Sequence, residues 1–293
     1  MASEPTSGAA PDEGTALHSL AFGGENSASL DAPSWRVAVA SVTGPSHIRR
    51  GVGCEDAAAA ASQGDWLVAV VCDGAGSSPR GSTGASVAAR SIAEDVLASV
   101  AGSATSVGVR EHLQSALAKA RLKLAEIATA EERTLSAFST TVVGAIGCRD
   151  RVLFFQIGDG TAVGFGSADE IRAVSLGRPK EYANETYFLT DETWSESLLF
   201  EEAEGVDSIF LVTDGVSPFL LEADVPKASF YQPVLEFLRR QGAGKGASAV
   251  QRLLSRDVVR KVVADDKTLL WAQWLGTKVE EPVVSRESTE LAG

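Results

Sequence analysis

The chain has 293 residues, of which 44% are apolar, and it carries a formal net charge of −13 at pH 7. This apolar content is enough to form one large domain with a buried core. The excess of acidic residues excludes nucleic acids and anionic membranes as expected partners, because both require a basic surface.

The cysteines and the apolar runs indicate an intracellular protein. Cys54, Cys72 and Cys148 show no CxxC spacing, so reduced thiols are expected. The first basic residue is Arg36, which leaves the N-terminus without the charged start of a secretory signal. No apolar run reaches membrane-spanning length. A cytoplasmic protein is therefore predicted.

The composition divides the chain into three parts. Residues 1–33 are rich in Ser, Ala, Gly and acidic residues without a sustained periodicity, which predicts a mobile leader. Residues 34–276 hold the periodic segments and are predicted to form one domain. The segment 277–293 is polar, and a loose tail is expected there.

The first elements of the domain are two strands followed by two helices. Apolar residues predict strands over 35–42 and 66–72, separated by a Gly- and Pro-containing loop over 44–57. Apolar residues at helical spacing then predict helices over 84–100 and 109–132, joined as an antiparallel pair.

The second half of the domain returns to strands. A polar, interrupted stretch over 172–204 is predicted to be a flap-like insertion, since long irregular excursions between strands are often functional. This order does not alternate as βαβ units do, so it favours a mostly antiparallel α+β domain. The remaining predicted elements are strands over 140–147, 152–158, 161–165, 209–213 and 268–274, and helices over 233–240 and 248–260.

Four apolar runs end in acidic residues, at Asp73, Asp159, Asp214 and the pair Asp265 and Asp266. Strands that deliver carboxylates to their ends suggest one shared site. Clustered carboxylates repel one another and raise one another's pKa, so such a site is tolerable chiefly when cations lie among them. Oxygen ligands without a Cys and His cluster favour magnesium or manganese over zinc.

Asp-Gly is also a strong hairpin signal, so each position has the alternative of a turn between two strands. The sequence that follows decides how strong this alternative is. At Asp73 a helical pattern follows, so the carboxylate is expected at an exposed strand end. At Asp159 the next segment is a strand, so a hairpin and a metal ligand are equally favoured. Glu55 and Asp56 alone suggest a solvated turn or the cap of a short helical alanine run, but their place one strand before Asp73 favours a metal role.

The glycine-rich stretch after Asp73 is not a nucleotide-binding P-loop, because it lacks the Gly-Lys-Ser/Thr ending whose lysine and hydroxyl contact phosphate and magnesium. Several motifs occur in a fixed order over residues 35–275. They are Ser46-His47, Cys54-Glu55-Asp56-Ala57, Asp73-Gly74-Ala75-Gly76-Ser77, Ser139-Thr140-Thr141, Ile157-Gly158-Asp159-Gly160, Glu181-Tyr182-Ala183-Asn184-Glu185-Thr186, Val212-Thr213-Asp214-Gly215 and Asp265-Asp266-Lys267-Thr268-Leu269. Taken together, these motifs resemble those of the metal-dependent PPM-type (type 2C) protein Ser/Thr phosphatases, bacterial subgroup.

The resemblance implies a four-layer α/β/β/α sandwich, in which two mostly antiparallel sheets are flanked by antiparallel helix pairs. It also implies two Mn²⁺ or Mg²⁺ ions at one end of the sandwich. By this resemblance Asp73 would bridge both ions, the carbonyl of Gly74 would add a ligand, and Asp214 and Asp265 would complete the shell of one ion.

The same resemblance implies roles for three further acids. Asp56, together with Glu55, would hold the other ion through water. Asp159 resembles the residue that supports a third, weaker metal. Asp265 is preferred over the aspartate that follows it, because Thr268 then falls in the register of the Ser or Thr found three residues after the family's metal ligand.

The chain departs from the family at two positions. Many relatives carry a His directly after the first Asp-Gly, where this chain has Ala75. Many also carry a phosphate-binding Arg a few residues before the acidic pair, whereas Arg49 and Arg50 lie slightly earlier here. His47 is a candidate for the missing catalytic role, with a structural hydrogen-bonding role as the alternative. Arg80 is a further candidate for binding phosphate, against ordinary surface charge.

The sequence therefore predicts metal-dependent hydrolysis of phosphoserine and phosphothreonine in proteins. Two divalent cations would lower the pKa of a bridging water, and no phosphoenzyme would form. The expected partner is a phosphorylated substrate of a Ser/Thr kinase, and the expected state is a monomer. The alternative is a catalytically weak or inactive member of the same fold that binds or regulates a partner.

Overall fold

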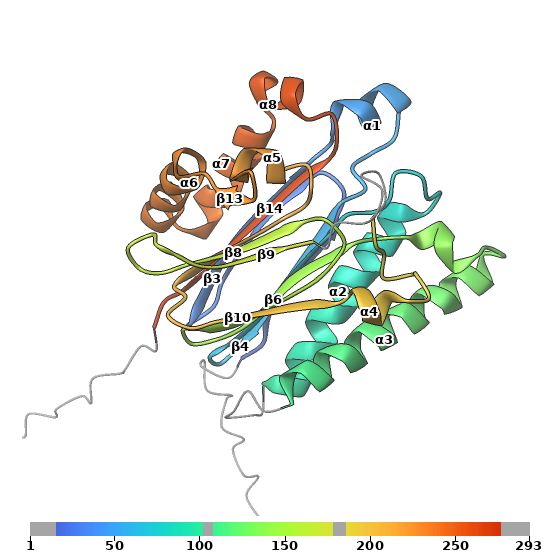
Figure 1. The fold of residues 1–293 in the computed structure, drawn as a ribbon, viewed down its shortest axis with the longest axis horizontal. Helices are drawn as coiled ribbons and strands as arrows, with labels where there is room; N and C mark the ends of the chain where they lie inside the picture. The colour runs from blue at the N-terminus through green and yellow to red at the C-terminus, as the bar shows by residue number, and fades with distance from the viewer. Residues whose placement is uncertain (1–15, 102–107, 178–185, 277–293) are drawn as a thin grey trace, which may run out of the picture.

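Two six-stranded antiparallel sheets pack face to face in the computed structural model, which describes residues 16–101, 108–177 and 186–276 (Figure 1). The first sheet has the strand order β1-β4-β5-β6-β7-β10. Its strands are β1 (His18–Gly23), β4 (Ala57–Gln63), β5 (Trp66–Cys72), β6 (Val142–Cys148), β7 (Arg151–Ile157) and β10 (Leu199–Ala203).

The second sheet has the strand order β2-β3-β14-β11-β8-β9, and every neighbouring pair is again antiparallel. Its central strands are almost wholly buried on both faces, as expected for a layer that lies between another sheet and helices. Its strands are β2 (Asn26–Asp31), β3 (Trp35–Val42), β8 (Thr161–Phe165), β9 (Ile171–Leu176), β11 (Ser208–Val212) and β14 (Lys267–Trp274).

The inner faces of the two sheets form one apolar core. Alternate residues of each strand point into this layer, including Leu67 and Val71 from β5 and Leu211 and Leu270 from β11 and β14. All four side chains are fully buried. The period-two alternation of these strands thus supplies the contact between the sheets.

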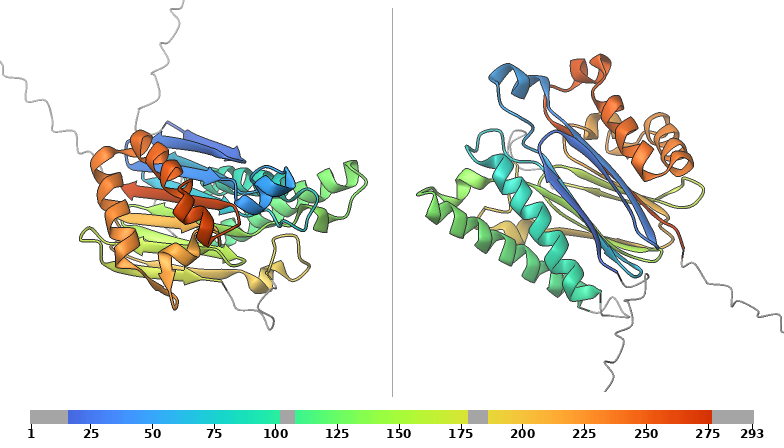
Figure 2. Two further views of the ribbon diagram at one scale, coloured as in Figure 1. Left: turned by 90° about the horizontal axis from the view of Figure 1, so that it is seen from above. Right: turned by 180° about the vertical axis from the view of Figure 1, so that it is seen from behind.

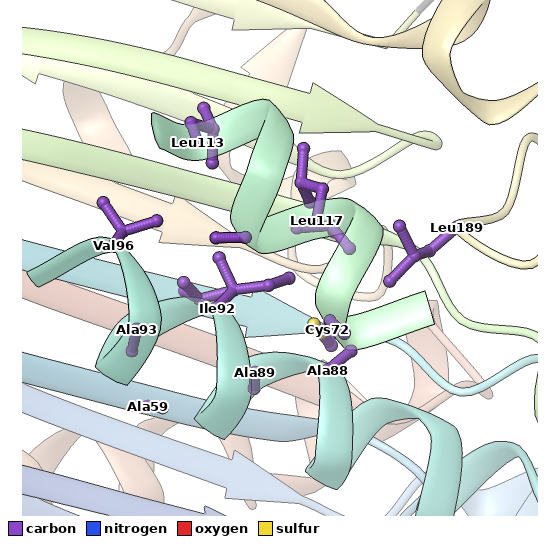
Figure 3. Packing of buried hydrophobic residues seen from close by; sticks show 14 of the residues in the cluster. Ala59, Cys72, Ala88, Ala89, Ile92, Ala93, Val96, Leu113, Leu117 and Leu189 are labelled. Atoms are coloured by element: carbon purple, nitrogen blue, oxygen red, sulfur yellow. The ribbon is translucent and has the colours of Figure 1, made fainter. Parts of the chain in front are cut away.

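The outer face of the first sheet is covered by α2 (Gly81–Val100) and α3 (Val109–Ala130). Small side chains allow α2 to lie close to the sheet: Ala59 of β4 lies beneath Ala89 and Ala93 of the helix (Figure 3). Ile92 and Leu117 fill the wider space between the two helices. This layer corresponds to the predicted antiparallel helix pair.

The outer face of the second sheet is covered by α6 (Ala228–Gln241) and α7 (Ala243–Leu254), as the two turned views show (Figure 2). Leu235 and Leu238 of α6 and Val250 of α7 are buried against it. The predicted four-layer sandwich of two mostly antiparallel sheets between helix pairs is therefore confirmed. No helix among the described residues combines the length and apolar content that a membrane crossing needs.

Short elements occupy the connections between these layers. They are α1 (Pro45–Arg50), the 3₁₀ helix η2 (Leu135–Phe138), α4 (Trp194–Ser197), α5 (Ser217–Leu220), β12 (Leu221–Glu222), β13 (Val225–Pro226) and α8 (Asp257–Val262).

The N-terminal prediction is wrong for residues 18–31. These residues form β1 and β2, which pair with β4 and β3 respectively. Their pattern is weak because both are edge strands with one polar face, and only Leu30 among their large apolar residues is fully buried. Residues 1–15 and the tail 277–293 lie outside the described residues.

Three further predictions need correction. The alanine run after Asp56 forms strand β4 and no helix. The insertion predicted over 172–204 contains most of β9 and all of β10, which are one edge strand of each sheet, while its segment 178–185 lies outside the described residues. The run before Asp265 is the end of α8 and the segment that follows it, so this aspartate precedes a strand.

Candidate metal centre

Asp73 and Gly74 lie directly after β5, where the chain leaves the centre of the first sheet. Thr140 and Thr141 hold this end: the backbone N–H of Thr141 donates to Asp73 O at 2.9 Å, and Thr140 Oγ1 donates to the same oxygen at 3.0 Å. A Cβ added at Gly74 would lie 2.4 Å from the carbonyl carbon of Gly81 and 2.8 Å from Glu55 O. Glycine is therefore required for the close approach of three backbone segments.

Asp214 and Gly215 follow β11 after Thr213, near the centre of the second sheet. A Cβ on Gly215 would lie 1.8 Å from Asp266 O, so this glycine also permits a close approach between backbones. The carboxyl groups of Asp73 and Asp214 contact each other, which brings the central strands of both sheets to one site.

Asp56 is buried beneath this contact. Its Oδ2 accepts hydrogen bonds from Thr268 Oγ1 at 2.6 Å and Thr213 Oγ1 at 3.0 Å. The Thr268 hydroxyl also lies 2.7 Å from Ser41 Oγ. Two threonines from neighbouring strands of the second sheet thus fix one oxygen of Asp56 and leave the other directed elsewhere.

Asp265 and Asp266 occupy different environments. Asp266 is buried, and its carboxylate accepts from the backbone N–H groups of Gly44 at 2.7 Å and Glu55 at 2.6 Å. His47 Nδ1 lies 2.7 Å from the same carboxylate. Asp265 is exposed, and among the described residues its carboxylate accepts only the backbone N–H of Asp266, at 2.9 Å. Of the two, Asp265 has oxygen lone pairs available for a cation.

His47 is buried between two acids. Its Nδ1 contacts Asp266, and its Nε2 lies 3.5 Å from Glu55 Oε2. Only 3% of its side chain is exposed. The ring therefore connects the loop before β4 with the segment before β14, and both ring nitrogens face carboxylates.

Burial and mutual repulsion raise the pKa values of the central acids. Burial raises the pKa of Asp73 well above its usual range, and the charges of Asp56, Asp214 and Asp265 add to this. Burial also raises the pKa of Asp56, with the charge of Asp266 as the next cause. Burial, followed by the charges of Asp159 and Asp265, raises the pKa of Asp214 to about 6. Each acid therefore responds to the charges of the others, as expected for a single cluster.

The cluster fits divalent cations that prefer oxygen ligands. Asp56 Oδ1 and Asp214 Oδ1 are buried without a hydrogen-bond partner among the described residues. A buried carboxylate oxygen without a partner is costly, and a cation would satisfy it. Because the acids offer only oxygen atoms, magnesium and manganese fit better than zinc.

Asp159 marks the point where the chain passes from one sheet to the other. It follows β7 of the first sheet and precedes β8 of the second, so the hairpin alternative is wrong here. Its exposed carboxylate accepts a hydrogen bond from Thr186 Oγ1 at 2.6 Å. Most of the predicted flap motif lies outside the described residues, but Thr186 brings its end to Asp159.

The three candidate arginines differ in their contacts. Arg50 Nη1 donates to Gly76 O at 3.4 Å, and Arg50 also lowers the pKa of Glu55, which burial raises. Arg49 is exposed on α1 and forms no ion pair with a described residue. Arg80 Nη2 donates to Glu131 Oε1 at 2.6 Å and its guanidinium lies over the Phe138 ring. Arg50 is thus the arginine that the structure brings to the acidic cluster.

A hollow of about 1350 Å³ lies at the other end of β5 from Asp73. Several of its lining charges pair with one another, as Arg149 with Asp65 and Arg151 with Glu204. The acidic cluster therefore has the stronger chemical case as the functional site.

Comparison with known proteins places the chain in a family. Residues 43–255 match the family described as Protein phosphatase 2C, and this match includes Glu55, Asp56, Asp73 and Asp214. The chain belongs to the protein phosphatase 2C family. It is 30% identical over 254 residues to Serine/threonine-protein phosphatase 3 of Escherichia coli strain K12, covering 82% of this chain and 99% of that protein.

Solved protein phosphatase 2C structures share the fold. The serine-threonine phosphatase 2C of Toxoplasma gondii superposes with a TM-score of 0.60 at 11% identity, covering 87% of this chain and 99% of that one. The phosphatase Stp1 of Staphylococcus aureus gives a TM-score of 0.55 at 16% identity, covering 82% and 95% of the two chains. The family match ends ten residues before Asp265, so the assignment of that aspartate depends on geometry.

Proposed function

We propose that this protein phosphatase 2C hydrolyses phosphoserine and phosphothreonine in proteins with the help of two divalent cations. One observation carries the proposal: acids from both sheets meet at one end of the sandwich, and two buried carboxylate oxygens there lack a partner among the described residues. The E. coli relative is named as a Ser/Thr phosphatase, and this chain covers 99% of it, so the relative supports the proposed substrate class.

Seven groups would hold the cations. When bound, two divalent cations supply a water of lowered pKa and neutralise the charge of the phosphoryl oxygens. Magnesium and manganese are the proposed ions, and a solved relative, RsbX, is described in complex with magnesium. The proposed ligands are Asp73 for both sites, the carbonyl of Gly74 as a further ligand, Asp214 and Asp265 for one site, Asp56 and Glu55 for the other, and Asp159 for a third, weaker site.

The other residues of the site position these ligands and the substrate. We assign His47 a positioning role, because it contacts both Glu55 and Asp266. Arg50 is the proposed phosphate ligand: its guanidinium, His47 and Glu55 all lie within 3.6 Å of the position where a Cβ of Gly76 would be. Arg80 is committed to Glu131, so its contribution to binding is expected to be smaller.

Water is the proposed nucleophile, so no phosphoenzyme forms. Cys72 directly precedes Asp73, but burial raises its pKa and keeps the thiol protonated. Burial raises the pKa of Cys54 in the same way. The three cysteines are free, which agrees with a reducing compartment such as the cytoplasm.

The test is turnover of an aryl phosphate and of a phosphothreonine peptide, with manganese and with EDTA. We expect manganese-dependent release of phosphate that falls at least about 100-fold in Asp73→Asn and Asp214→Asn, because both changes remove a charged ligand. Arg50→Ala is expected to raise KM more than Arg49→Ala does.

A lack of turnover combined with manganese binding would instead support the non-catalytic alternative. Calorimetric titration of manganese into the wild-type chain measures that binding directly. Full activity of both Asn variants would contradict the proposed metal site.

A further inference from the structure

Two short helices stand at the end of the sandwich that carries the acidic cluster. In both views α1 and α8 project side by side from this end (Figures 1 and 2). Ser46 of α1 connects them: its backbone N–H and its hydroxyl both donate to Ala264 O, at 2.9 and 2.7 Å. Asp265 is the next residue after Ala264, so the outer surface of the two helices borders the proposed metal site.

The outer face of α8 is apolar, although the solvent-exposed face of a helix is usually polar. Val258 and Val262 are 60% and 67% exposed, and their spacing of four residues places them on one face. Val259, one residue further round the helix, is buried. On α1, Ile48 is 50% exposed. These two helices thus hold three of the nine exposed large apolar side chains of the described residues.

The same surface is basic, although the whole chain carries a net charge of −13. Arg49, Arg256 and Lys261 are exposed, and none of them forms an ion pair with a described residue. Asp257 is the only acidic residue within the two helices. Free cations beside exposed valines provide complementary contacts for an acidic and apolar partner.

We propose that this surface docks the substrate segment that flanks the phosphorylated residue, and that this segment carries acidic and apolar side chains. This inference rests on the proposed function. Carboxylates of the segment would pair with the free cations, and its apolar side chains would cover the exposed valines. We call it the α1–α8 surface, and it comprises Ile48, Arg49, Arg256, Val258, Lys261 and Val262.

A protein segment suits this surface better than an anionic bilayer does. The whole chain carries a net charge of −13, so a flat negative membrane would be repelled around the small basic area that attracts it. An extended segment contacts only the α1–α8 surface and can direct its phosphate toward Arg50. The short distance along the chain from Val262 to Asp265 makes both contacts possible at once.

The test compares two phosphothreonine peptides, one flanked by Glu and Leu and one flanked by Ser and Gly. In Lys261→Glu with Val262→Ser, kcat/KM for the Glu and Leu peptide is expected to fall about tenfold, through KM, because one attraction and one apolar contact are lost. Turnover of an aryl phosphate, which has no flanking residues, is expected to stay unchanged.

The matched control is Lys119→Glu with Leu122→Ser on α3. Leu122 is 63% exposed and Lys119 is exposed, so the control makes the same charge reversal and a similar loss of an exposed apolar side chain on the helix layer of the first sheet. An equal fall in the control would show that net charge alone acts on the peptide, and it would overturn the docking surface.

Fluorescence anisotropy of the labelled Glu and Leu peptide separates docking from catalysis. Weaker binding by the α8 variant supports docking even if no turnover is detected, whereas absent turnover of every substrate contradicts the proposed function. Normal turnover with no change in the α8 variant overturns the docking surface alone. Cosedimentation with phosphatidylserine vesicles tests the membrane alternative. If the α8 variant loses vesicle binding and keeps peptide binding, the surface is a membrane contact and the proposal fails.

Discussion

The adjacent aspartates Asp265 and Asp266, just before β14, have different contacts. Asp266 accepts from two backbone N–H groups and contacts His47, so its charge is already used to join the loop before β4 to β14. Asp265 keeps lone pairs free at the surface of the cluster. A carboxylate saturated by protein donors is a poor metal ligand, so Asp265 is the proposed ligand and Asp266 is expected to hold the backbone beside it.

Asp214 provides a pH prediction. Its pKa rises from an ordinary value of 3.8 to about 6 in the folded chain. Between these pH values the folded state holds a proton that the unfolded state has released. The free energy of unfolding of the metal-free protein should therefore fall as pH rises from about 4 to about 6. The expected decrease is up to about 3 kcal/mol. Urea unfolding in EDTA measures this slope, and Asp214→Asn should reduce it. A slope of the opposite sign would contradict the cluster.

Manganese binding is expected to show the reverse dependence. Protons and cations compete for the same carboxylates, so manganese affinity should rise as pH increases through about 6. Calorimetric titrations at two pH values on either side of this point provide the measurement.

Lys267 gives a second prediction at this scale. Its side chain is fully buried, Nζ donates to Asp265 O at 2.5 Å, and burial lowers its pKa while the nearby aspartates oppose that shift. This buried cation repels a metal ion and partly neutralises the acids. Lys267→Met should therefore tighten manganese binding by about 1 kcal/mol and enlarge the stabilisation that manganese provides.

The control for this change is Lys245→Met, at an exposed position of α7 away from the acids. Calorimetry of manganese binding and thermal unfolding with and without the metal are the two readouts. Unchanged or weaker manganese binding in Lys267→Met alone would show that the lysine has no electrostatic role.

Much of the candidate site could be predicted from sequence because the acids follow recurring patterns. Asp73, Asp159 and Asp214 each follow a strand and precede glycine, and the structure brings all three into one electrostatic cluster. The role of Asp266 could not be predicted, because its donors come from residues more than 200 positions away in the chain. The same holds for His47, whose two acidic neighbours depend on tertiary packing.

The helices and strands were predictable where an apolar pattern is strong. The strand over 35–42 and the strand over 161–165 coincide with β3 and β8. By contrast, β4 contains five successive alanines, which favour a helix in isolation, and tertiary pairing with β1 and β5 overrides that preference. The edge strand β9 was missed because it is partly polar.

The alanines of β4 lead to a prediction about packing. Ala59 is 1% exposed and lies between the first sheet and α2, where small side chains keep the helix close (Figure 3). Ala59→Leu should overfill this layer and lower the free energy of unfolding by about 1–3 kcal/mol. Ala130→Leu, at the exposed end of α3, is the control for the added volume. Urea unfolding measures both, and equal stability of the two variants would show that the layer is loosely packed.

The whole molecule is joined at one side by its first two strands. β1 is one edge strand of the first sheet and β2 is one edge strand of the second, and they follow each other directly in the chain. The segment between them therefore links the two layers, with Gly24 N–H donating to Asp56 O at 2.9 Å. Through this bond the N-terminal strands also contact the backbone of a proposed metal ligand.

Truncation tests whether these strands belong to the domain. Removal of residues 1–31 should lower the free energy of unfolding by at least about 3 kcal/mol, because it exposes apolar surface on β3 and β4 and removes the burial of Leu30. The newly exposed edges should also promote self-association, which light scattering detects. Removal of residues 1–15 takes away neither strand and serves as the control. Equal stability of the two truncated chains in urea would show that residues 18–31 do not stabilise the domain. Loss of manganese affinity only in the chain without residues 1–31 would show that the contact of Gly24 with Asp56 helps to position the metal site.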